Sequence, residues 1–266
     1  MKLLALDTAT EGCSAALLIN GALTGRELEL GRGHAEHILP MIDELLAEAA
    51  MSLGALDGIA FGRGPGGFTG VRLAASVAQG LAFGAGLPVV PVSDLMAVAQ
   101  RAFGSGSAGS EVAHAAGKAE RVAPEHPPAG SGVAPGGREH PPLGTEPPRV
   151  IVCNDARMRE VYWACFEQID GLAGLAGEER VSPPESVVIP PAWTSPVIAA
   201  GRGFAAYPQL RSRLEPQLSV IHDRMLPRAH EIALLAAPML HKGGAVPAEQ
   251  AAPVYLRDEV AQPAER

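Results

Sequence analysis

Apolar residues in the first hundred positions fall into short continuous runs separated by longer stretches with helical spacing. The short runs predict buried strands at Leu3–Asp7, Cys13–Ile19, Ala22–Leu30, Asp57–Phe61 and Leu87–Val92. The longer stretches predict helices at His34–Ala50 and Val71–Phe83 and from Ser93, as an N-cap, to Arg101. Asn20-Gly21 marks a tight hairpin between the second and third strands. The predicted order is therefore βββαβαβα.

A second, weaker copy of this pattern follows after residue 148. Arg149–Asn154 and Glu160–Glu167 predict a hairpin, and later segments predict strands at Glu178–Val181 and Pro196–Ala200 and a helix at Ala229–Leu240. We therefore expect an α/β protein with an N-terminal subdomain, residues 1–103, and a C-terminal subdomain, residues 149–266. The last segment of the second subdomain is a candidate to pack back on the first.

The segment between the copies, residues 104–148, is dense in glycine and proline and contains no aromatic residue. Its apolar residues larger than alanine are Val112, Val122, Val133 and Leu143. Such a segment buries too little surface to offset the entropy of ordering it. We predict a disordered insertion whose removal leaves the fold nearly unchanged.

The densest glycine run, Gly62–Arg72, leads from the fourth predicted strand into the second predicted helix. It lacks the Gly-Lys-Ser/Thr of a phosphate-binding Walker loop, and its spacing fits a dinucleotide-binding loop only approximately. Two interpretations remain open at this point. The backbone N–H groups bind an anion at the helix N-terminus, or the small residues allow two backbone segments to touch.

Composition limits the class of function. The formal net charge is −8 and the pI is about 5.5, which argues against an extensive nucleic-acid-binding face. The three cysteines show no ligand spacing and are expected to be reduced core residues. His34 and His37 lack a third ligand, so no metal site is expected. No signal peptide or membrane-length apolar run is evident, so the expected location is the cytoplasm.

Several motifs resemble those of the TsaB (YeaZ) family, relatives of the TsaD/Kae1 enzymes. The matching segments are Leu6–Thr10, His37–Pro40, Gly64–Arg72, Asp155–Trp163 and Tyr255–Arg257, with Gly67 where the family usually has serine. The signature residues are Gly64, Pro65, Gly66, Phe68, Thr69, Gly70, Arg72, Asp155, Arg157, Glu160 and Tyr162. They occur in the family's order along most of the chain.

The resemblance implies a duplicated ribonuclease H-like fold of the actin, Hsp70 and sugar-kinase type, with the second copy degenerate. It also implies a non-catalytic scaffold that works with TsaD and the P-loop ATPase TsaE. These proteins attach threonylcarbamoyl to the adenosine next to the anticodon, position 37, in tRNAs reading ANN codons. The tRNA would be contacted only through the complex, and no cofactor is expected. Asp7, Thr8 and Thr10 occupy the position of the superfamily's first phosphate loop, with Ala9 where glycine is usual.

The expected partner surface consists of the first two long helices. Apolar residues on more than one face of the first helix predict an exposed strip, and small residues on the second permit close helix approach. The proposed interface residues are Ile38, Met41, Ile42, Leu45, Gly70, Ala74 and Ala78. This surface would bind TsaD, or a second copy of the chain when TsaD is absent. The alternative is an ATP-dependent enzyme of the same fold, a kinase or carbamoyltransferase.

Overall fold

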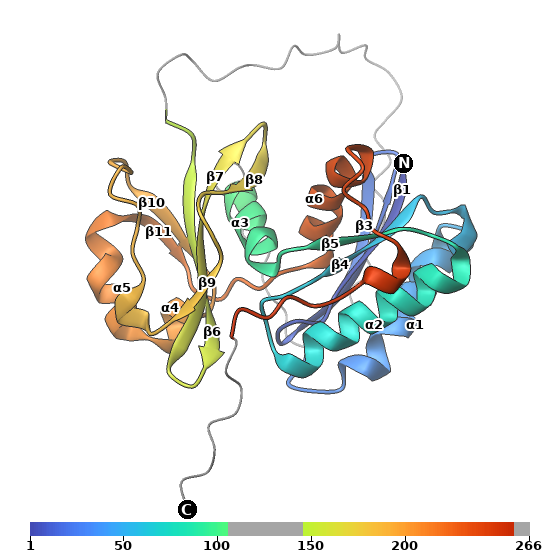
Figure 1. Cartoon of the computed structure of the whole chain (residues 1–266), viewed down its shortest axis with the longest axis horizontal. Coiled ribbons are helices and arrows are strands. Elements are labelled where there is room, and N and C mark those ends of the chain that lie inside the picture. The colour runs from blue at the N-terminus through green and yellow to red at the C-terminus, as the bar shows by residue number, and fades with distance from the viewer. Residues whose placement is uncertain (106–145, 258–266) are drawn as a thin grey trace, which may run out of the picture.

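The computed structural model describes residues 1–105 and 146–257, which form two lobes that each contain one mixed β-sheet (Figure 1). The sheet of the first lobe has the strand order β3-β2-β1-β4-β5. Its strands are β1 (Lys2–Asp7), β2 (Gly12–Ile19), β3 (Ala22–Glu29), β4 (Gly58–Gly62) and β5 (Val89–Val92). The first three strands are antiparallel, and β4 and β5 run parallel to β1.

Helices cover both faces of this sheet, which explains why its central strands consist mostly of apolar residues. Helices α1 (His34–Glu48) and α2 (Phe68–Ala85) cover one face, and α6 (Ala229–His241) covers the other. Alternate residues of β1 point to opposite faces. Leu4 and Leu6 accordingly pack under α1 and α2, whereas Ala5 packs under α6.

The sheet of the second lobe repeats the same directional pattern in the order β11-β10-β6-β7-β8. Its strands are β6 (Arg149–Arg157), β7 (Glu160–Ile169), β8 (Leu172–Leu175), β10 (Val197–Ala200) and β11 (Leu218–His222), with β9 (Arg180–Ser182) pairing with β7. Three antiparallel strands are again followed by two that run parallel to the first. The outer face carries the short helices α4 (Gly203–Ala206) and α5 (Pro208–Leu214).

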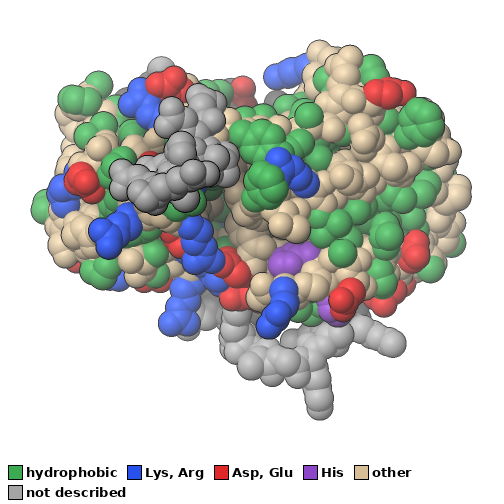
Figure 2. Space-filling view, turned by 60° about the horizontal axis from the view of Figure 1, so that its bottom comes forward, with side chains coloured by type: hydrophobic (Ala, Val, Ile, Leu, Met, Phe, Trp, Pro, Cys, Tyr) green, Lys and Arg blue, Asp and Glu red, His purple; other side chains and the backbone are tan. Residues whose placement is uncertain are grey.

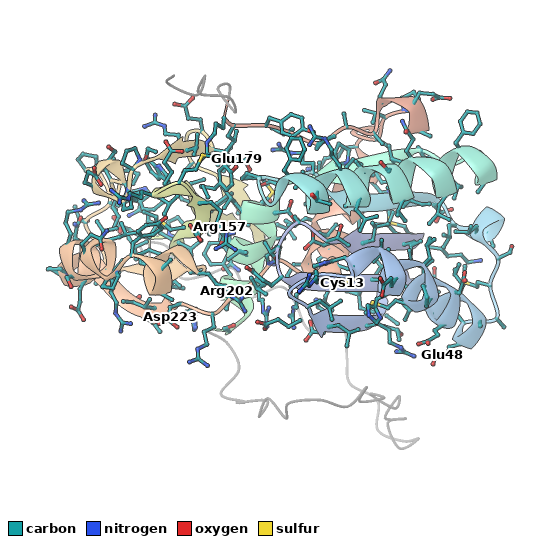
Figure 3. The ribbon with its side chains drawn as sticks, turned by 90° about the horizontal axis from the view of Figure 1, so that it is seen from below. Cys13, Glu48, Arg157, Glu179, Arg202 and Asp223 are labelled. Carbon is teal, nitrogen blue, oxygen red and sulfur yellow. The ribbon has the colours of Figure 1, made fainter. Side chains whose placement is uncertain are left out.

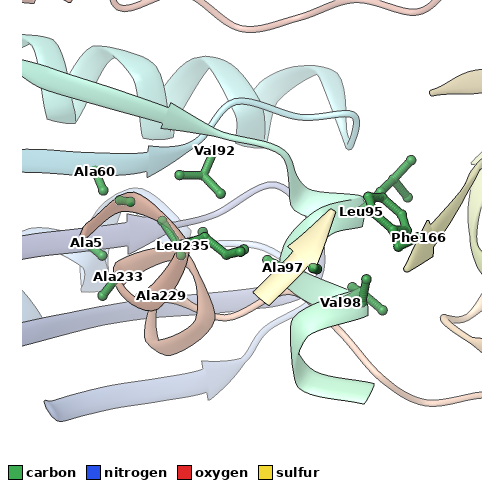
Figure 4. Close-up of a cluster of buried hydrophobic side chains, with 14 of the residues drawn as sticks. Ala5, Ala60, Val92, Leu95, Ala97, Val98, Phe166, Ala229, Ala233 and Leu235 are labelled. Atoms are coloured by element: carbon green, nitrogen blue, oxygen red, sulfur yellow. The ribbon is translucent and has the colours of Figure 1, made fainter. Parts of the chain in front are cut away.

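Two helices lie between the sheets and join the lobes into one core. Helix α3 (Asp94–Ser105) packs on β6, β7 and β8 of the second sheet, although it belongs to the first half of the sequence. Helix α6 comes from the second half and packs on β1, β2, β4 and β5. Figure 4 shows Ala229 and Ala233 of α6 beside Ala5, and Leu95 of α3 beside Phe166. The last helix therefore belongs structurally to the first lobe.

The α/β prediction is confirmed, with differences at the edges of elements. Helix α2 begins at Phe68, three residues before the predicted start at Val71, because Gly67 already serves as its N-cap. The predictions missed β8, β11, α4 and α5, which are short and lack clear periodicity. Short 3₁₀ turns occur at Leu53–Ala55, Pro184–Ser186, Glu215–Gln217 and Ala248–Gln250. Most of the predicted insertion, residues 106–145, lies outside the described residues.

Among the described residues, the helices are all too short or too polar to cross a bilayer.

Candidate functional site

The glycine-rich loop between β4 and α2 packs directly against the backbone that follows β1. A Cβ atom on Gly70 would lie 2.0 Å from the carbonyl oxygen of Thr8, and one on Gly66 would lie 2.4 Å from that of Ala9. The N–H of Gly67 donates to the Ala9 carbonyl at 2.7 Å. These glycines thus allow two backbone segments to touch, the second of the two interpretations that the sequence left open.

The polar groups of the predicted phosphate loop are already engaged within the protein. The buried hydroxyl of Thr8 donates to the carbonyl of Gly70 at 2.7 Å, and the hydroxyl of Thr10 accepts the N–H of Gly12 at 3.1 Å. The carboxylate of Asp7 accepts the N–H of Ala9 at 3.0 Å. A phosphate would have to displace these bonds to bind here.

A second carboxyl group, that of Asp94 at the start of α3, lies beside Asp7. Burial raises the pKa of Asp7 to about 6. Burial and the neighbouring charge of Asp7 raise the pKa of Asp94 well above its usual range. Asp94 also accepts the N–H of Gly64, so the pair lies directly under the glycine-rich loop. Asp94 was not predicted as a site residue, because a single acidic residue after a strand is also typical of a helix N-terminus.

Glu179, in the loop before β9, reaches from the second lobe into the first. Its carboxylate accepts from Arg63 of the glycine-rich loop at 3.0 Å and from the hydroxyl of Ser93, which caps α3. Only 6% of the Glu179 side chain is exposed. A buried carboxylate held by two donors fixes the glycine-rich loop relative to the second sheet.

Further ion pairs cross the boundary between the lobes. Arg157 and Arg202 from the second lobe both contact Glu11, at 3.4 Å and 3.3 Å respectively, and Arg202 also pairs with Glu29. In Figure 3 Glu179, Arg157 and Arg202 lie one below another along the boundary between the lobes. In Figure 2 basic side chains follow the same boundary. These ion pairs occupy part of the boundary between the two lobes.

The turn between β6 and β7 has an unusual backbone. Arg157, Met158 and Arg159 have φ values of 61°, 53° and 63°, so three consecutive non-glycine residues are left-handed. Asp155 supports the turn by accepting from the Arg157 N–H at 2.9 Å and the Tyr207 hydroxyl at 3.0 Å. A hollow of about 520 Å³ lies beside the turn. It is lined by Met158, Arg159, Glu160, Pro183, Pro184, Glu185, Tyr207 and Gln209.

The signature segments, distant in sequence, come together through the end of the chain. The guanidinium of Arg72 lies 3.1 Å from the centre of the Phe68 ring and 5.0 Å from that of Tyr255. Two residues later, Arg257 donates to the carboxylate of Glu160 and to the Ala156 carbonyl. The segment Tyr255–Arg257 therefore bridges the glycine-rich loop and the β6–β7 turn. Tyr162 is partly buried, in the core between the sheets, and Thr69 is exposed on the first turn of α2.

The prediction of an exposed apolar strip on the first helix is wrong at the residues chosen. Met41 is only 7% exposed, and Ile38, Ile42 and Leu45 are buried against the first sheet. Ala74 and Ala78 of α2 are also buried, and Gly70 contacts Thr8. The physical reason is that Leu4, Leu6 and the other residues on this face of the sheet need the whole apolar stripe as their cover.

The outward face of α1 and α2 consists of different residues. Leu39 of α1 is 45% exposed and Phe83 of α2 is 67% exposed. Gly80 and Gly84 lie on the same outer side of α2, where an added Cβ would meet no described atom within 4 Å. Figure 2 shows hydrophobic side chains on the lobe that carries these helices. The four-residue spacing of Gly80 and Gly84 was the available sequence signal for this face.

Comparisons with known proteins define first the broader class. Residues 29–120 match the family model of TsaD, tRNA N6-adenosine threonylcarbamoyltransferase. Two solved chains from Pseudomonas aeruginosa resemble this fold over 96% of this chain and 99% of theirs. One is YeaZ, with a TM-score of 0.74 and 37% identity. The other is an uncharacterized protein with similarity to peptidase YeaZ, with a TM-score of 0.75 and 40% identity. The chain is therefore of the TsaD-like, YeaZ-type class.

Curated relatives narrow the class to one family. The tRNA threonylcarbamoyladenosine biosynthesis protein TsaB of Escherichia coli is 35% identical over 98% of this chain and 96% of its own length. The protein of the same name from Haemophilus influenzae is 36% identical over 98% of this chain and 95% of its own. The chain belongs to the TsaB family, and the resemblance found in the sequence is confirmed.

Proposed function

We propose that this chain is a non-catalytic partner subunit in tRNA threonylcarbamoyladenosine biosynthesis. It supports the transferase TsaD, together with TsaE, in modifying adenosine 37 of tRNAs that read ANN codons. Membership of the TsaB family supports the pathway, since the relatives carry this process in their names. The acidic net charge of −8 supports contact with tRNA only through the complex.

The observation that carries the non-catalytic role is the contact between the glycine-rich loop and the segment after β1. The carbonyl oxygens of Thr8 and Ala9 fill the space in which Cβ atoms of Gly70 and Gly66 would lie. The hydroxyl of Thr8 is committed to Gly70. A nucleotide phosphate needs free N–H groups and an open loop, and this loop is closed on its own backbone.

The partner surface we propose is the outward face of α2 with the adjoining part of α1. Glycine within a helix costs about 1 kcal/mol relative to alanine. A Cβ atom added to Gly80 or Gly84 would meet no described atom within 4 Å, so packing within the described chain does not require glycine at either position. Close approach of a partner helix would account for both glycines, and the exposed Leu39 and Phe83 would supply apolar contact area. The same face would pair two copies of this chain when TsaD is absent.

Two further proposals accompany this function. The common strand order of the two sheets supports the duplication of a ribonuclease H-like unit, with subdomains at residues 1–103 and 149–266. A role in tRNA modification supports a cytoplasmic location.

The test is reconstitution with purified components. TsaD, TsaE, ATP, the threonylcarbamoyl-adenylate donor and tRNA are incubated with and without this chain, and the modified nucleoside is measured. We expect modification only when the chain is present, and neither ATP hydrolysis nor modification by the chain alone. Modification by the chain without TsaD, or steady ATP hydrolysis, would favour the alternative of an ATP-dependent enzyme.

A further inference from the structure

The buried side chains of Asp7 and Asp94 are neighbours, and each has one carboxyl oxygen without a hydrogen-bond donor among the described residues. Asp7 Oδ1 accepts the N–H of Ala9 at 3.0 Å, and Asp94 Oδ2 accepts the N–H of Gly64. Asp7 Oδ2 and Asp94 Oδ1 are buried, and neither has a donor among the described residues. Asp94 Oδ1 and Asp7 Oδ1 lie 2.3 Å and 2.5 Å from the position that a Cβ atom on Gly62 would take, so the two carboxyl groups are immediate neighbours. Two ionised carboxylates repel at such short range, and a hydrogen bond between them requires a proton.

Gly62 packs closely against this pair. A Cβ atom on Gly62 would lie 2.3 Å from Asp94 Oδ1 and 2.5 Å from Asp7 Oδ1, so a larger residue would have to displace the two carboxyl groups. Both carboxyl groups are fully buried. A divalent cation such as Mg²⁺ needs more ligands than two carboxylates. In the part of the chain that the structure describes, no group of three or more His, Cys, Asp or Glu side chains could hold a metal ion.

The neighbouring charges do not neutralise the pair. The basic side chains that act on the pair are Arg63 of the glycine-rich loop and His34 at the start of α1. Arg63 donates to Glu179 at 3.0 Å, and the Nε2 of His34 lies 2.9 Å from the carbonyl oxygen of Thr10. A further titratable neighbour is the buried thiol of Cys13 on β2, whose pKa is raised to about 11 by burial and by the charge of Asp7. Two carboxylates in this setting cannot both be ionised without a large cost.

We propose that Asp7 and Asp94 share one proton at neutral pH and form a pH-sensitive contact that holds the glycine-rich loop against β1. Asp94 holds the loop through the N–H of Gly64, and Asp7 holds the segment after β1 through the N–H of Ala9. The shared proton links Asp94, and with it the loop, to Asp7 and the segment after β1. Loss of that proton at alkaline pH places two negative charges face to face and releases the loop from the segment that it covers.

The sign of the pH dependence follows from the proton held by the folded state. Both pKa values are raised from the usual 3.8, that of Asp7 to about 6 and that of Asp94 well above its usual range. The stabilisation is fully present below the unfolded pKa and is lost as pH rises through the folded values. The variant Asp94→Asn keeps the shape, accepts from Gly64 and donates to Asp7 without a titratable proton. Its advantage over the wild type should therefore grow with pH.

The experiment measures thermal unfolding of the full chain between pH 5 and pH 8.5, a range chosen as roughly spanning the raised values. The variants are Asp94→Asn and, as a control, Asp57→Asn, because Asp57 also accepts a backbone N–H, that of Lys2, but is exposed. We expect the midpoint difference between Asp94→Asn and the wild type to grow by roughly 3 °C or more towards alkaline pH. Asp57→Asn should show no such trend. Parallel curves for Asp94→Asn and the wild type would overturn the proposal.

A direct measurement keeps the proposal testable even if Asp94→Asn does not fold. Carbon-13 NMR of aspartate carboxyl groups in the wild-type chain should show one side chain still protonated near neutral pH. Backbone amides of Gly64 and Gly67 should lose protection from hydrogen exchange as that group titrates. Titration of every aspartate below about pH 5 would contradict the shared proton. Stabilisation of the wild type by Mg²⁺ or Mn²⁺ that Asp94→Asn abolishes would show a cation site in its place.

Discussion

Arg63 and Glu179 form an ion pair at 3.0 Å that joins the glycine-rich loop of the first lobe to the second lobe. Ser93 donates to the same carboxylate, so Glu179 receives one donor from the loop and one from the cap of α3. Together with the core shared by α3 and α6, this contact holds the two lobes in one arrangement.

The contacts of Glu179 predict that substituting this residue lowers the free energy of unfolding more than substituting its neighbour Glu178. Glu179→Ala leaves Arg63 and the Ser93 hydroxyl without their acceptor and should lower the free energy of unfolding by about 1–3 kcal/mol. Glu178→Ala removes only a pair with Arg180 in which both side chains are more than half exposed, and should cost at most about 0.5 kcal/mol. Urea unfolding of both variants measures the difference. Equal effects would mean that Glu179 does not join the lobes.

Because Met41 is buried rather than exposed, an acidic substitution at this position should damage the core. Met41→Asp should lower the free energy of unfolding by about 3 kcal/mol or more, because it buries an unpaired charge against the first sheet. Leu39→Asp, two residues earlier on the exposed side, should change the stability by less than about 0.5 kcal/mol. Chemical unfolding of the isolated chain compares them. A fully stable Met41→Asp variant would restore the original surface assignment.

The left-handed turn at Arg157, Met158 and Arg159 predicts a stabilising substitution. Met158 is 71% exposed and has φ 53°, a conformation that glycine adopts without a Cβ penalty. Met158→Gly should raise the free energy of unfolding by roughly 0.5–1 kcal/mol. Met158→Ala removes the same side-chain contacts but keeps the Cβ, so it should give no such gain. Destabilisation by glycine would show that the turn is not strained.

The environment of Glu231 predicts how the stability of the protein changes at acidic pH. Burial alone would raise the pKa of this carboxyl, yet hydrogen bonds from His230 and Arg228 outweigh it and bring the pKa to about 2. A lowered folded pKa gives stability that is present above the unfolded value of 4.5 and is lost as pH falls towards 2. The contribution is at most about 3 kcal/mol.

Glu231→Gln should therefore lower stability at neutral pH and flatten the loss between pH 4.5 and about 2. The exposed Glu249→Gln provides a matched control in which the acid profile stays that of the wild type. Stability measured by urea unfolding across this range separates the two variants. An unchanged profile for Glu231→Gln would contradict the assignment.

The fold could be predicted from the sequence where periodicity was strong. The strands near Leu3, Cys13 and Ile59 and the helix from His34 follow directly from their apolar spacing. The short strands β8 and β11 have only four and five residues and gain their pairing from neighbours distant in sequence. The sequence also could not predict that α3 packs on the second sheet and α6 on the first. An apolar stripe shows that a helix covers a sheet, but it does not show which sheet.

The candidate site shows the same division between local and long-range information. The glycine run and the Asp155–Tyr162 hairpin were identified because their residue types are unusual. Pairing of Asp7 with Asp94 and of Arg63 with Glu179 depends on positions that are 87 and 116 residues apart, set only by the tertiary fold. The predicted exposure on the first helix was wrong, because an apolar stripe does not show how many of its residues the core needs, and this core uses both Ile38 and Met41.

Association with TsaD through the outward face of α2 tests the central claim most directly. Size-exclusion chromatography with light scattering, followed by calorimetric titration, compares the wild type with Gly80→Arg and with Ser212→Arg, an exposed position on α5 of the other lobe. Arginine favours helix over glycine, so Gly80→Arg should be at least as stable as the wild type. We predict that Gly80→Arg loses TsaD binding by at least about tenfold and that Ser212→Arg binds as the wild type does. A folded Gly80→Arg variant that binds TsaD with undiminished affinity would contradict the account.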